Sequence, residues 1–412
     1  MKEMQYPKSY ETLEAGKEFI PGGVMGTRRP ENFIPDVYPL YVKQGKGAHF
    51  FDIDGHEYID WLAGFGPVLL GHSYEVVDNA AIDRIRKGFC FNLSQDVQNI
   101  LAEKITQIIP CAEKAIFVLS GSDATTAAIR LARAYTGRDK ILKFGYNGWH
   151  DWCVPVATGV PDKAREDIIP FKYNDINSVI EAMDKFKGKV AGVILTPLAH
   201  EFNRPLEFPQ NNFLEKLREI TKMEGALLIF DEIRTGFRIA LGGAQEYFGV
   251  KPDLAAFGKA MANGYPIGLV AGSADVMMAS QKAYISSTFF YNSFPMCAAV
   301  ATLNEIESKG VIAHIWKLGK ILQQGMQDLV AKYNLPAVIS GPPPMPFLTF
   351  SYNPDKKYVE RRKIFYTETT RNGIFLHPYH HWYVLFTHTE NDVHITLDVI
   401  DKAFKKIVEK VK

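Results

Sequence analysis

The strongest constraint on the fold is a change of pattern at about residue 95, after which short apolar runs alternate with segments of helical periodicity. The runs are AIFVLS (115–120), KILKF (140–144), AGVILTP (191–197), ALLIFDE (226–232), DLAAFGK (253–259) and IGLVAG (267–272). Amphipathic stretches at 124–135 and 213–223 separate several of them. This alternation predicts an α/β fold with a mostly parallel sheet and helices on both faces. Ligands of such sheets bind at the carboxyl ends of the strands.

The two ends of the chain have other patterns. The segment PLYVKQGKGAHFFDIDGHEYIDWL (39–62) alternates apolar and polar residues around glycines, which is typical of a small antiparallel meander. The last hundred residues indicate a smaller α+β lobe that ends in a helix with one apolar face. We therefore predict an N-terminal segment over 1–65, a large domain over 66–310 and a small C-terminal domain over 311–412.

Composition excludes several classes of protein. The chain of 412 residues has a formal net charge of +1 and only short basic runs, so nucleic-acid binding is not expected. Its four cysteines are widely spaced and form no metal-binding pattern, so no metal site is expected. No apolar stretch approaches the length of a membrane span, and the first residues are charged and polar, unlike a signal peptide. We expect a cytoplasmic protein that makes no contact with membranes.

Ser120, Gly121, Ser122 and Asp123 lie between a predicted strand and a predicted helix. Small residues at that point expose backbone N–H groups at a helix N-terminus, which bind anions such as phosphate. Ser120 and Asp123 also have the spacing of a capping box, so a helix cap without a ligand is the alternative.

Asp231 and Glu232 end the run ALLIF, and Lys259 ends the run DLAAFG. A carboxylate at a buried strand end needs a partner, which a cofactor's pyridinium nitrogen, a metal ion or a salt bridge would supply. A buried lysine has a lowered pKa and can form a Schiff base, whereas a surface lysine at a loop would not. The phosphate loop, the carboxylate and the amine follow in that order on successive predicted strands. Together they favour a site for pyridoxal 5′-phosphate (PLP), with Lys259 as the Schiff-base lysine and catalytic amine.

These residues lie in a chain that resembles the class III PLP-dependent aminotransferases, and within them the glutamate-1-semialdehyde 2,1-aminomutase branch. The resemblance rests on IPGGV (20–24), GAHFFDIDGHEYIDWL (47–62), LLGHS (69–73), SGSDATTAAIRLARAYTGRDKI (120–141), residues 230–268 and STFFYN (287–292). It covers nearly the whole chain. It implies a fold type I PLP-dependent transferase, working as a homodimer with the active site at the subunit interface.

The resemblance also implies roles for single residues. Asp231 would meet the pyridine nitrogen, and Ile233 and Tyr146 would lie against the ring. Gly121 and Ser122 would bind the phosphate, and Thr288 would reach the phosphate of the partner subunit's cofactor. A further residue, Arg29 or the adjacent Arg28, would meet a substrate carboxylate.

The chain departs from the family pattern where substrates are chosen. The usual Tyr-His-Gly is Tyr146-Asn147-Gly148, and the segment from Trp149 to Tyr173 is shorter than the aminomutase's gating loop. A mutase must retain its intermediate behind a lid. The short segment therefore favours an aminotransferase that moves an amino group between separate donor and acceptor molecules, while an intramolecular aminomutase, an epimerase or a lyase stay open. A non-catalytic protein of the same fold is the alternative from another class.

The carbonyl acceptor is not specified by these motifs. An aromatic, histidine-rich stretch in the C-terminal lobe, which includes His381, is either pocket lining or strand packing. As a pocket it would suit a sugar-like carbonyl. The run GYNGWHDW (145–152), which includes Trp149, is similar to relatives associated with cell-surface sugar pathways. A keto or amino acid acceptor, bound through Arg28 or Arg29, is the alternative.

Overall fold

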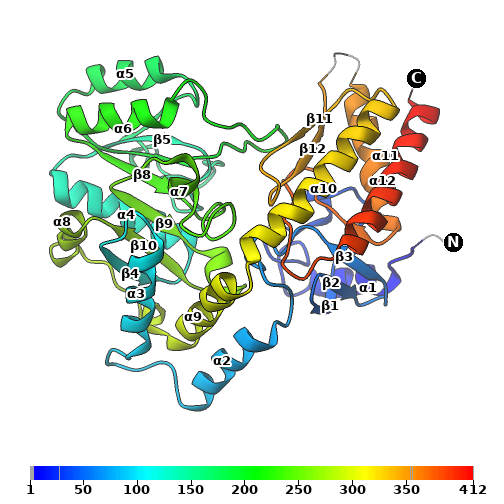
Figure 1. Ribbon diagram of the computed structural model, residues 1–412, viewed down its shortest axis with the longest axis horizontal. Coiled ribbons are helices and arrows are strands. Elements are labelled where there is room, and N and C mark those ends of the chain that lie inside the picture. The colour runs from blue at the N-terminus through cyan, green and yellow to red at the C-terminus, as the bar shows by residue number, and fades with distance from the viewer. Residues whose placement is uncertain (1–3, 27, 353, 355, 412) are drawn as a thin grey trace. The chain divides into compact units, whose positions relative to one another are not determined.

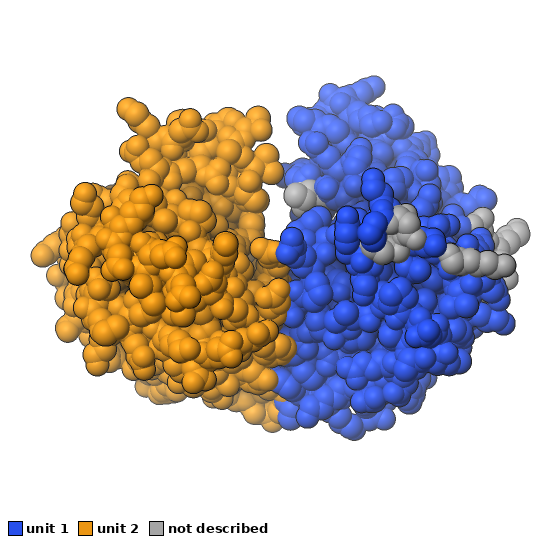
Figure 2. Space-filling model, turned by 90° about the horizontal axis from the view of Figure 1, so that it is seen from above, with its two compact units in different colours: residues 1–74, 202–206, 313–412 blue, residues 75–201, 207–312 orange. Residues whose placement is uncertain are grey.

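The computed structural model describes residues 4–26, 28–352, 354 and 356–411. They form two compact units, drawn in different colours in Figure 2. Unit 1 takes residues 1–74, 202–206 and 313–412, and unit 2 takes residues 75–201 and 207–312. Elements carry the labels of Figure 1. The predicted α/β class is confirmed.

The described residues of unit 2 build a seven-stranded sheet in the order β4-β10-β9-β8-β7-β5-β6. Strand β10 is antiparallel to both of its neighbours, and the remaining pairs are parallel. The bounds are β4 Lys114–Val118, β5 Lys140–Phe144, β6 Ile168–Pro170, β7 Val190–Leu195, β8 Leu227–Asp231, β9 Leu254–Phe257 and β10 Gly268–Gly272. All six apolar runs form strands, because continuous apolar side chains suit a sheet that is covered on both faces.

One detail of the sequence-based prediction was wrong. The strands that precede the phosphate loop, the carboxylate and the lysine are β4, β8 and β9, and β10 lies between β4 and β9. The run IGLVAG (267–272) returns antiparallel to β9 and then pairs with β4. Periodicity reports that a run is buried but not its direction, so the sequence did not reveal this insertion.

Helix α4 packs across the middle of the sheet, on β4 and β7 to β10. Its buried face is formed largely by alanines, which let the helix approach the strands closely. Ser120 caps its first turn and Gly137, with a left-handed φ of 68°, ends it. The helices of unit 2 are α2 Glu75–Arg86, α3 Val97–Ile108, α4 Gly121–Thr136, α5 Ile176–Lys185, α6 Phe213–Glu224, α7 Ala244–Phe248, α8 Ala274–Met277 and α9 Ser293–Ser308.

Unit 1 joins the two ends of the chain. The predicted meander forms β1 to β3, and β13 adds to it in parallel with β3. The Tyr38 hydroxyl also donates to the Leu376 carbonyl at 2.7 Å. The N-terminal segment therefore shares one unit with the C-terminal lobe, whereas the sequence suggested separate parts. Its elements are α1 Pro7–Gly16, β1 Val42–Lys46, β2 His49–Asp52, β3 Glu57–Asp60, α10 Val311–Lys332, β11 Ala337–Ser340, β12 Phe347–Phe350, α11 Lys357–Arg371, β13 Ile374–Phe375 and α12 Glu390–Lys410.

Two further properties concern the helices and the metal-binding side chains of the described residues. No helix among them has the length and apolar character needed to cross a membrane. The same residues contain no group of three or more His, Cys, Asp or Glu side chains arranged to hold a metal ion.

Candidate active site

Asp231 and Lys259 lie at the same end of two neighbouring parallel strands. Asp231 is the last residue of β8 and is paired with Ala256 of β9. Lys259 follows β9 after Gly258 and begins the short 3-10 helix η3, Lys259–Ala262. Because parallel strands place their carboxyl ends at one sheet edge, the two residues predicted to serve one cofactor emerge side by side.

The ammonium group of Lys259 is disfavoured where it lies. Burial lowers its pKa to about 7, and the positive charges of Arg234 and Arg238 act in the same direction, against the attraction of Asp231. Its φ of 45° is left-handed, which is uncommon for a residue with a side chain. A lysine with a substantial neutral fraction near pH 7 is a competent nucleophile and proton carrier.

The Asp231 carboxylate is buried and accepts hydrogen bonds at both oxygens. Asn147 Nδ2 donates to Oδ2 at 2.8 Å, and the Ile233 N–H donates to Oδ1 at 3.1 Å. Burial raises the pKa of Asp231, while these two bonds and the charges of Arg234 and Lys259 oppose the rise. Sequence reasoning noticed Asn147 only as a departure from the family pattern and missed this contact.

Glu232 has a separate set of partners. It accepts from the N–H groups of Ala244 and Gln245, at 2.7 and 3.0 Å, and from the Thr235 hydroxyl. Burial raises the pKa of Glu232 to about 7. Glu232 therefore holds the N-terminal turn of α7, and only Asp231 of the acidic pair belongs with Lys259.

Gly121, Ile233 and Gly258 meet beside this pair. A Cβ atom at position 121 would lie 3.0 Å from Ile233 Cδ1, and one at position 258 would lie 3.5 Å from the same atom. The Ser120 hydroxyl accepts from the Asp123 N–H at 3.3 Å and donates to the Asp123 carboxylate at 2.7 Å. The helix cap is therefore present at the start of α4.

The loop after β5 contacts the start of α4. The Trp149 N–H donates to Ser122 Oγ at 3.3 Å, and the Trp149 ring is largely exposed. Tyr146 is half exposed, and the Arg234 guanidinium lies 5.6 Å from its ring centroid. Arg234 also contacts His200 Nδ1 at 2.6 Å. The sequence did not predict a role for Arg234. The one signal that could have identified it is its position two residues after Asp231-Glu232.

Thr288 is exposed and begins the 3-10 helix η5, Thr288–Tyr291. Exposed apolar side chains lie close to it in the sequence and on the segment 89–95. Gln95 links the two segments, because its Nε2 lies 3.2 Å from the carbonyl oxygens of both Phe89 and Tyr291.

The predicted substrate residues of unit 1 have different settings. Arg28 lies 5.9 Å from the ring centroid of Phe65, which in turn lies 5.3 Å from the ring of His380. Arg29 instead folds back on its own segment and donates to the Pro21 carbonyl at 3.4 Å. His381 is only 2% exposed and stacks on His380. Within unit 1, Arg28 and Arg29 are both exposed, whereas His380 is partly exposed and His381 is buried.

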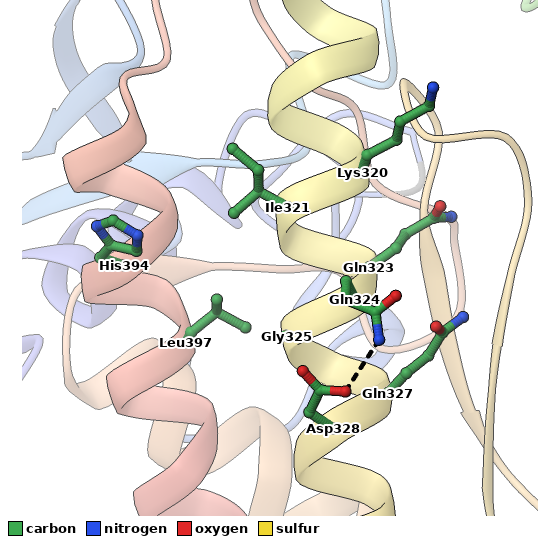
Figure 3. A pocket seen from close by; sticks show the side chains of 9 residues that line it. All are labelled: Lys320, Ile321, Gln323, Gln324, Gly325, Gln327, Asp328, His394 and Leu397. Carbon is green, nitrogen blue, oxygen red and sulfur yellow. Dashed lines mark hydrogen bonds between the residues drawn. The ribbon is translucent and has the colours of Figure 1, made fainter.

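A hollow in unit 1 does not involve these residues (Figure 3). It measures about 640 Å³ and lies along α10 and α12. A hydrogen bond of 2.9 Å joins Gln324 to Asp328 on its wall. The lining residues are Lys320, Ile321, Gln323, Gln324, Gly325, Gln327, Asp328, His394 and Leu397. None of the predicted cofactor or substrate residues lines it, so we do not assign the chemistry there.

Comparison with known proteins places this arrangement in a family. The model of class III aminotransferases matches residues 35–410. The chain belongs to the class III aminotransferases. The predicted family, the fold and the PLP cofactor are thereby confirmed.

Individual relatives cover the same length. A 3-aminobutyryl-CoA aminotransferase of Cloacimonas acidaminovorans is 42% identical, over 98% of this chain and 99% of its own. A glutamate-1-semialdehyde 2,1-aminomutase of Macrococcus caseolyticus is 35% identical, over 98% and 100%. The PLP-bound structure of the FumI protein of Sphingopyxis sp. MTA144 superposes with a TM-score of 0.93 at 30% identity, over 98% of this chain and 97% of that one.

The residues present fit PLP. The lack of a side chain at Gly121 lets the start of α4 lie close against Ile233, and the site also holds a buried carboxylate and a lysine of lowered pKa. When bound, PLP withdraws electrons from the carbon that bears the substrate's amino group. The chain's part would be to orient the cofactor ring, to keep a negative charge at Asp231 and to move a proton through the Lys259 amine.

Proposed function

We propose that this aminotransferase acts on an amino group at carbon 3 of a short acyl chain, carried as a coenzyme A thioester or as the free acid. The observation that supports this substrate class is the 42% identity to a 3-aminobutyryl-CoA aminotransferase over nearly the full length of both chains. The carbonyl product is then a 3-oxoacyl group, and a second substrate returns the cofactor to its aldehyde form.

The proposed roles in the site follow the geometry of unit 2. Lys259 forms the covalent link to the cofactor and carries the proton. Asp231 pairs with the pyridine nitrogen, and Gly121 and Ser122 hold the phosphate at the start of α4. Ile233 and Tyr146 cover the ring.

An intramolecular aminomutase is the second candidate, since one relative with that activity is 35% identical. The segment from Trp149 to Tyr173 favours transamination. It contains the short 3-10 helix η2, Asp162–Ala164, and the three-residue strand β6, with exposed residues at 155–159 and 161–164. A short, exposed segment is a poor lid for retaining an intermediate.

For substrate selection we propose Arg28 as the group that meets an anionic substrate, with Arg29, Trp149 and His381 as secondary candidates. Arg28 has an exposed guanidinium beside an aromatic ring, a setting that leaves it able to bind a carboxylate. The sugar-like acceptor remains an alternative that the histidine-rich stretch of unit 1 suggests.

A homodimer is part of the proposal. Large apolar side chains are exposed on the two segments that Gln95 joins, and exposed apolar patches of this kind mark interfaces. They are Phe91, Leu93, Tyr284 and Phe289. Thr288 lies beside Phe289 and would reach the partner's cofactor phosphate. Sedimentation of the L93D variant should show monomers, whereas an unchanged dimer would contradict this surface.

The cytoplasm stays the proposed compartment, since the four cysteines are free thiols.

A half-reaction screen tests the substrate class. The PLP form is mixed separately with 3-aminobutyryl-CoA, 3-aminobutyrate, L-glutamate and glutamate-1-semialdehyde, and loss of the aldehyde-form absorbance is followed. We expect 3-aminobutyryl-CoA or 3-aminobutyrate to convert the cofactor to its amine form with release of the oxo product. Turnover of glutamate-1-semialdehyde alone, with its amine returned to the same molecule, would support the mutase instead.

A further inference from the structure

Asn147 is 2% exposed, and its side chain is directed at Asp231. Its backbone carbonyl accepts from the Thr125 hydroxyl at 2.6 Å, which ties the residue to helix α4. Asn147 is therefore held at two points. Its backbone carbonyl is bound to α4, and its side-chain amide is bound to the end of β8.

Only one of the two polar atoms of the Asn147 side chain has a hydrogen-bond partner among the described residues. Nδ2 donates to Asp231, while Oδ1 is buried without a hydrogen-bond partner among the described residues. An unsatisfied buried acceptor costs stability, so such a group calls for an explanation. Reversing the amide would aim Oδ1 at the carboxylate, and two acceptors repel unless Asp231 takes a proton. The observed orientation is the one that suits an ionised Asp231.

The charge of Asp231 depends on what faces it. Lys259 follows β9, Arg234 lies in the loop after β8, and Lys143 lies on β5. Tyr146 and Cys153 belong to the segment after β5. Burial lowers the pKa of both lysines. Asn147 donates to Asp231 at 2.8 Å, and it does so at every ordinary pH because an amide does not titrate.

We propose that Asn147 is a positioning residue that keeps Asp231 ionised and aimed at the pyridine nitrogen of PLP. The inference rests on the proposed role of Asp231. A donor that never titrates makes the protonation of the ring nitrogen insensitive to pH, because the carboxylate keeps its hydrogen bond whether its neighbours are charged or neutral. The unsatisfied Oδ1 is then the cost of using an amide for this task.

The chain offers a matched control. Gln245 is a second buried amide beside the other carboxylate of the acidic pair, since its N–H and its Nε2 both lie within hydrogen-bond distance of Glu232. Replacing Gln245 with alanine disturbs an equivalent buried amide at the same strand end without touching Asp231.

The test loads the holoenzyme with PLP labelled with ¹⁵N in the ring and follows the nitrogen's chemical shift against pH. PLP affinity and thermal unfolding are measured on the same samples. We expect a protonated nitrogen throughout the titration in the wild type and in Q245A. In N147A the nitrogen should lose its proton within that range, and PLP should bind roughly 10- to 100-fold more weakly.

The isosteric N147D variant sharpens the test and replaces N147A if that variant does not fold. A carboxyl at position 147 can donate to Asp231 only while it holds a proton. N147D should match the wild type at low pH and depart from it as the pH rises. Equal departure at every pH, an unchanged titration in N147A, or an equal effect of Q245A would each overturn the inference.

The D231A variant separates this inference from the proposed function. If D231A leaves the ring nitrogen protonated, the role of Asp231 itself fails. If D231A removes the proton while N147A does not, only the role of Asn147 fails.

Discussion

Asp231 and Glu232 are adjacent in the chain, yet their carboxylates share no hydrogen-bond partner. Asp231 accepts from Asn147 and Ile233, and Glu232 accepts from Thr235, Ala244 and Gln245. Successive residues of a strand point to opposite faces, which explains the separation. Asp231 belongs with Lys259 at the sheet edge, and Glu232 anchors the first turn of α7.

This separation predicts distinct effects of two substitutions. E232A should lower the free energy of unfolding by about 3 kcal/mol, because it leaves two buried N–H groups without an acceptor. Its bound PLP should keep the wild-type absorbance. Urea unfolding and absorbance spectra measure the two effects. D231A should instead change mainly the absorbance of bound PLP and lower the free energy of unfolding less. A changed cofactor spectrum in E232A would contradict this division of roles.

Lys259 should be the residue that traps the cofactor. Treatment of the holoenzyme with borohydride should fix PLP to the wild type, and K259A should show no covalent cofactor by mass spectrometry. K143A is the control, since Lys143 is also half-buried at the end of a strand and its pKa is lowered by burial. Trapping that persists in K259A, or disappears in K143A, would place the link elsewhere.

The PLP-free protein should become more stable as the pH rises from about 7. Burial holds the pKa of Lys259 near 7, against 10.5 in its ordinary state. In that interval the unfolded chain binds a proton that the folded chain does not, so raising the pH favours the folded state, by at most ~1.4 kcal/mol per pH unit. Urea unfolding of wild type and K259M at pH values across this window tests it. Parallel curves for the two proteins would contradict the assigned pKa.

Arg28 and Arg29 should differ in their effect on substrates. R28A should raise the KM for a carboxylate-bearing substrate roughly 10-fold or more while kcat changes less, because a charge-assisted hydrogen bond is lost. R29A should change KM little, since its guanidinium is engaged by the Pro21 carbonyl. Steady-state kinetics with a neutral amine as the comparison substrate measure both. A larger effect of R29A would reverse the assignment.

The sequence predicted those parts of the fold that depend on local patterning. The six apolar runs became strands, and Lys259 and Asp231 emerged together because both follow adjacent parallel strands. The direction of β10 was missed because burial gives no direction. The Asn147 contact was missed for another reason: it joins the ends of β5 and β8, which are separated in the sheet by β7. Such a contact depends on the three-dimensional path of two loops.

The aromatic stretch near the C-terminus shows a different limit. Pocket lining and strand packing have the same composition, and in the structure the burial of this stretch changes from one residue to the next. His380 is partly exposed beside Phe65, whereas His381 directly after it is buried against Tyr383. Composition cannot separate adjacent residues that differ in burial.

The pairing of β13 with β3 has a consequence for synthesis. Ile374 lies beside Ile59, so the N-terminal sheet cannot be completed until nearly the whole chain has left the ribosome. All residues of unit 2 emerge earlier, with only the short 202–206 excursion to interrupt them. Domains fold as units as they are synthesised. Unit 2 should therefore mature first, while β1 to β3, although made earlier, wait for their last partner strand.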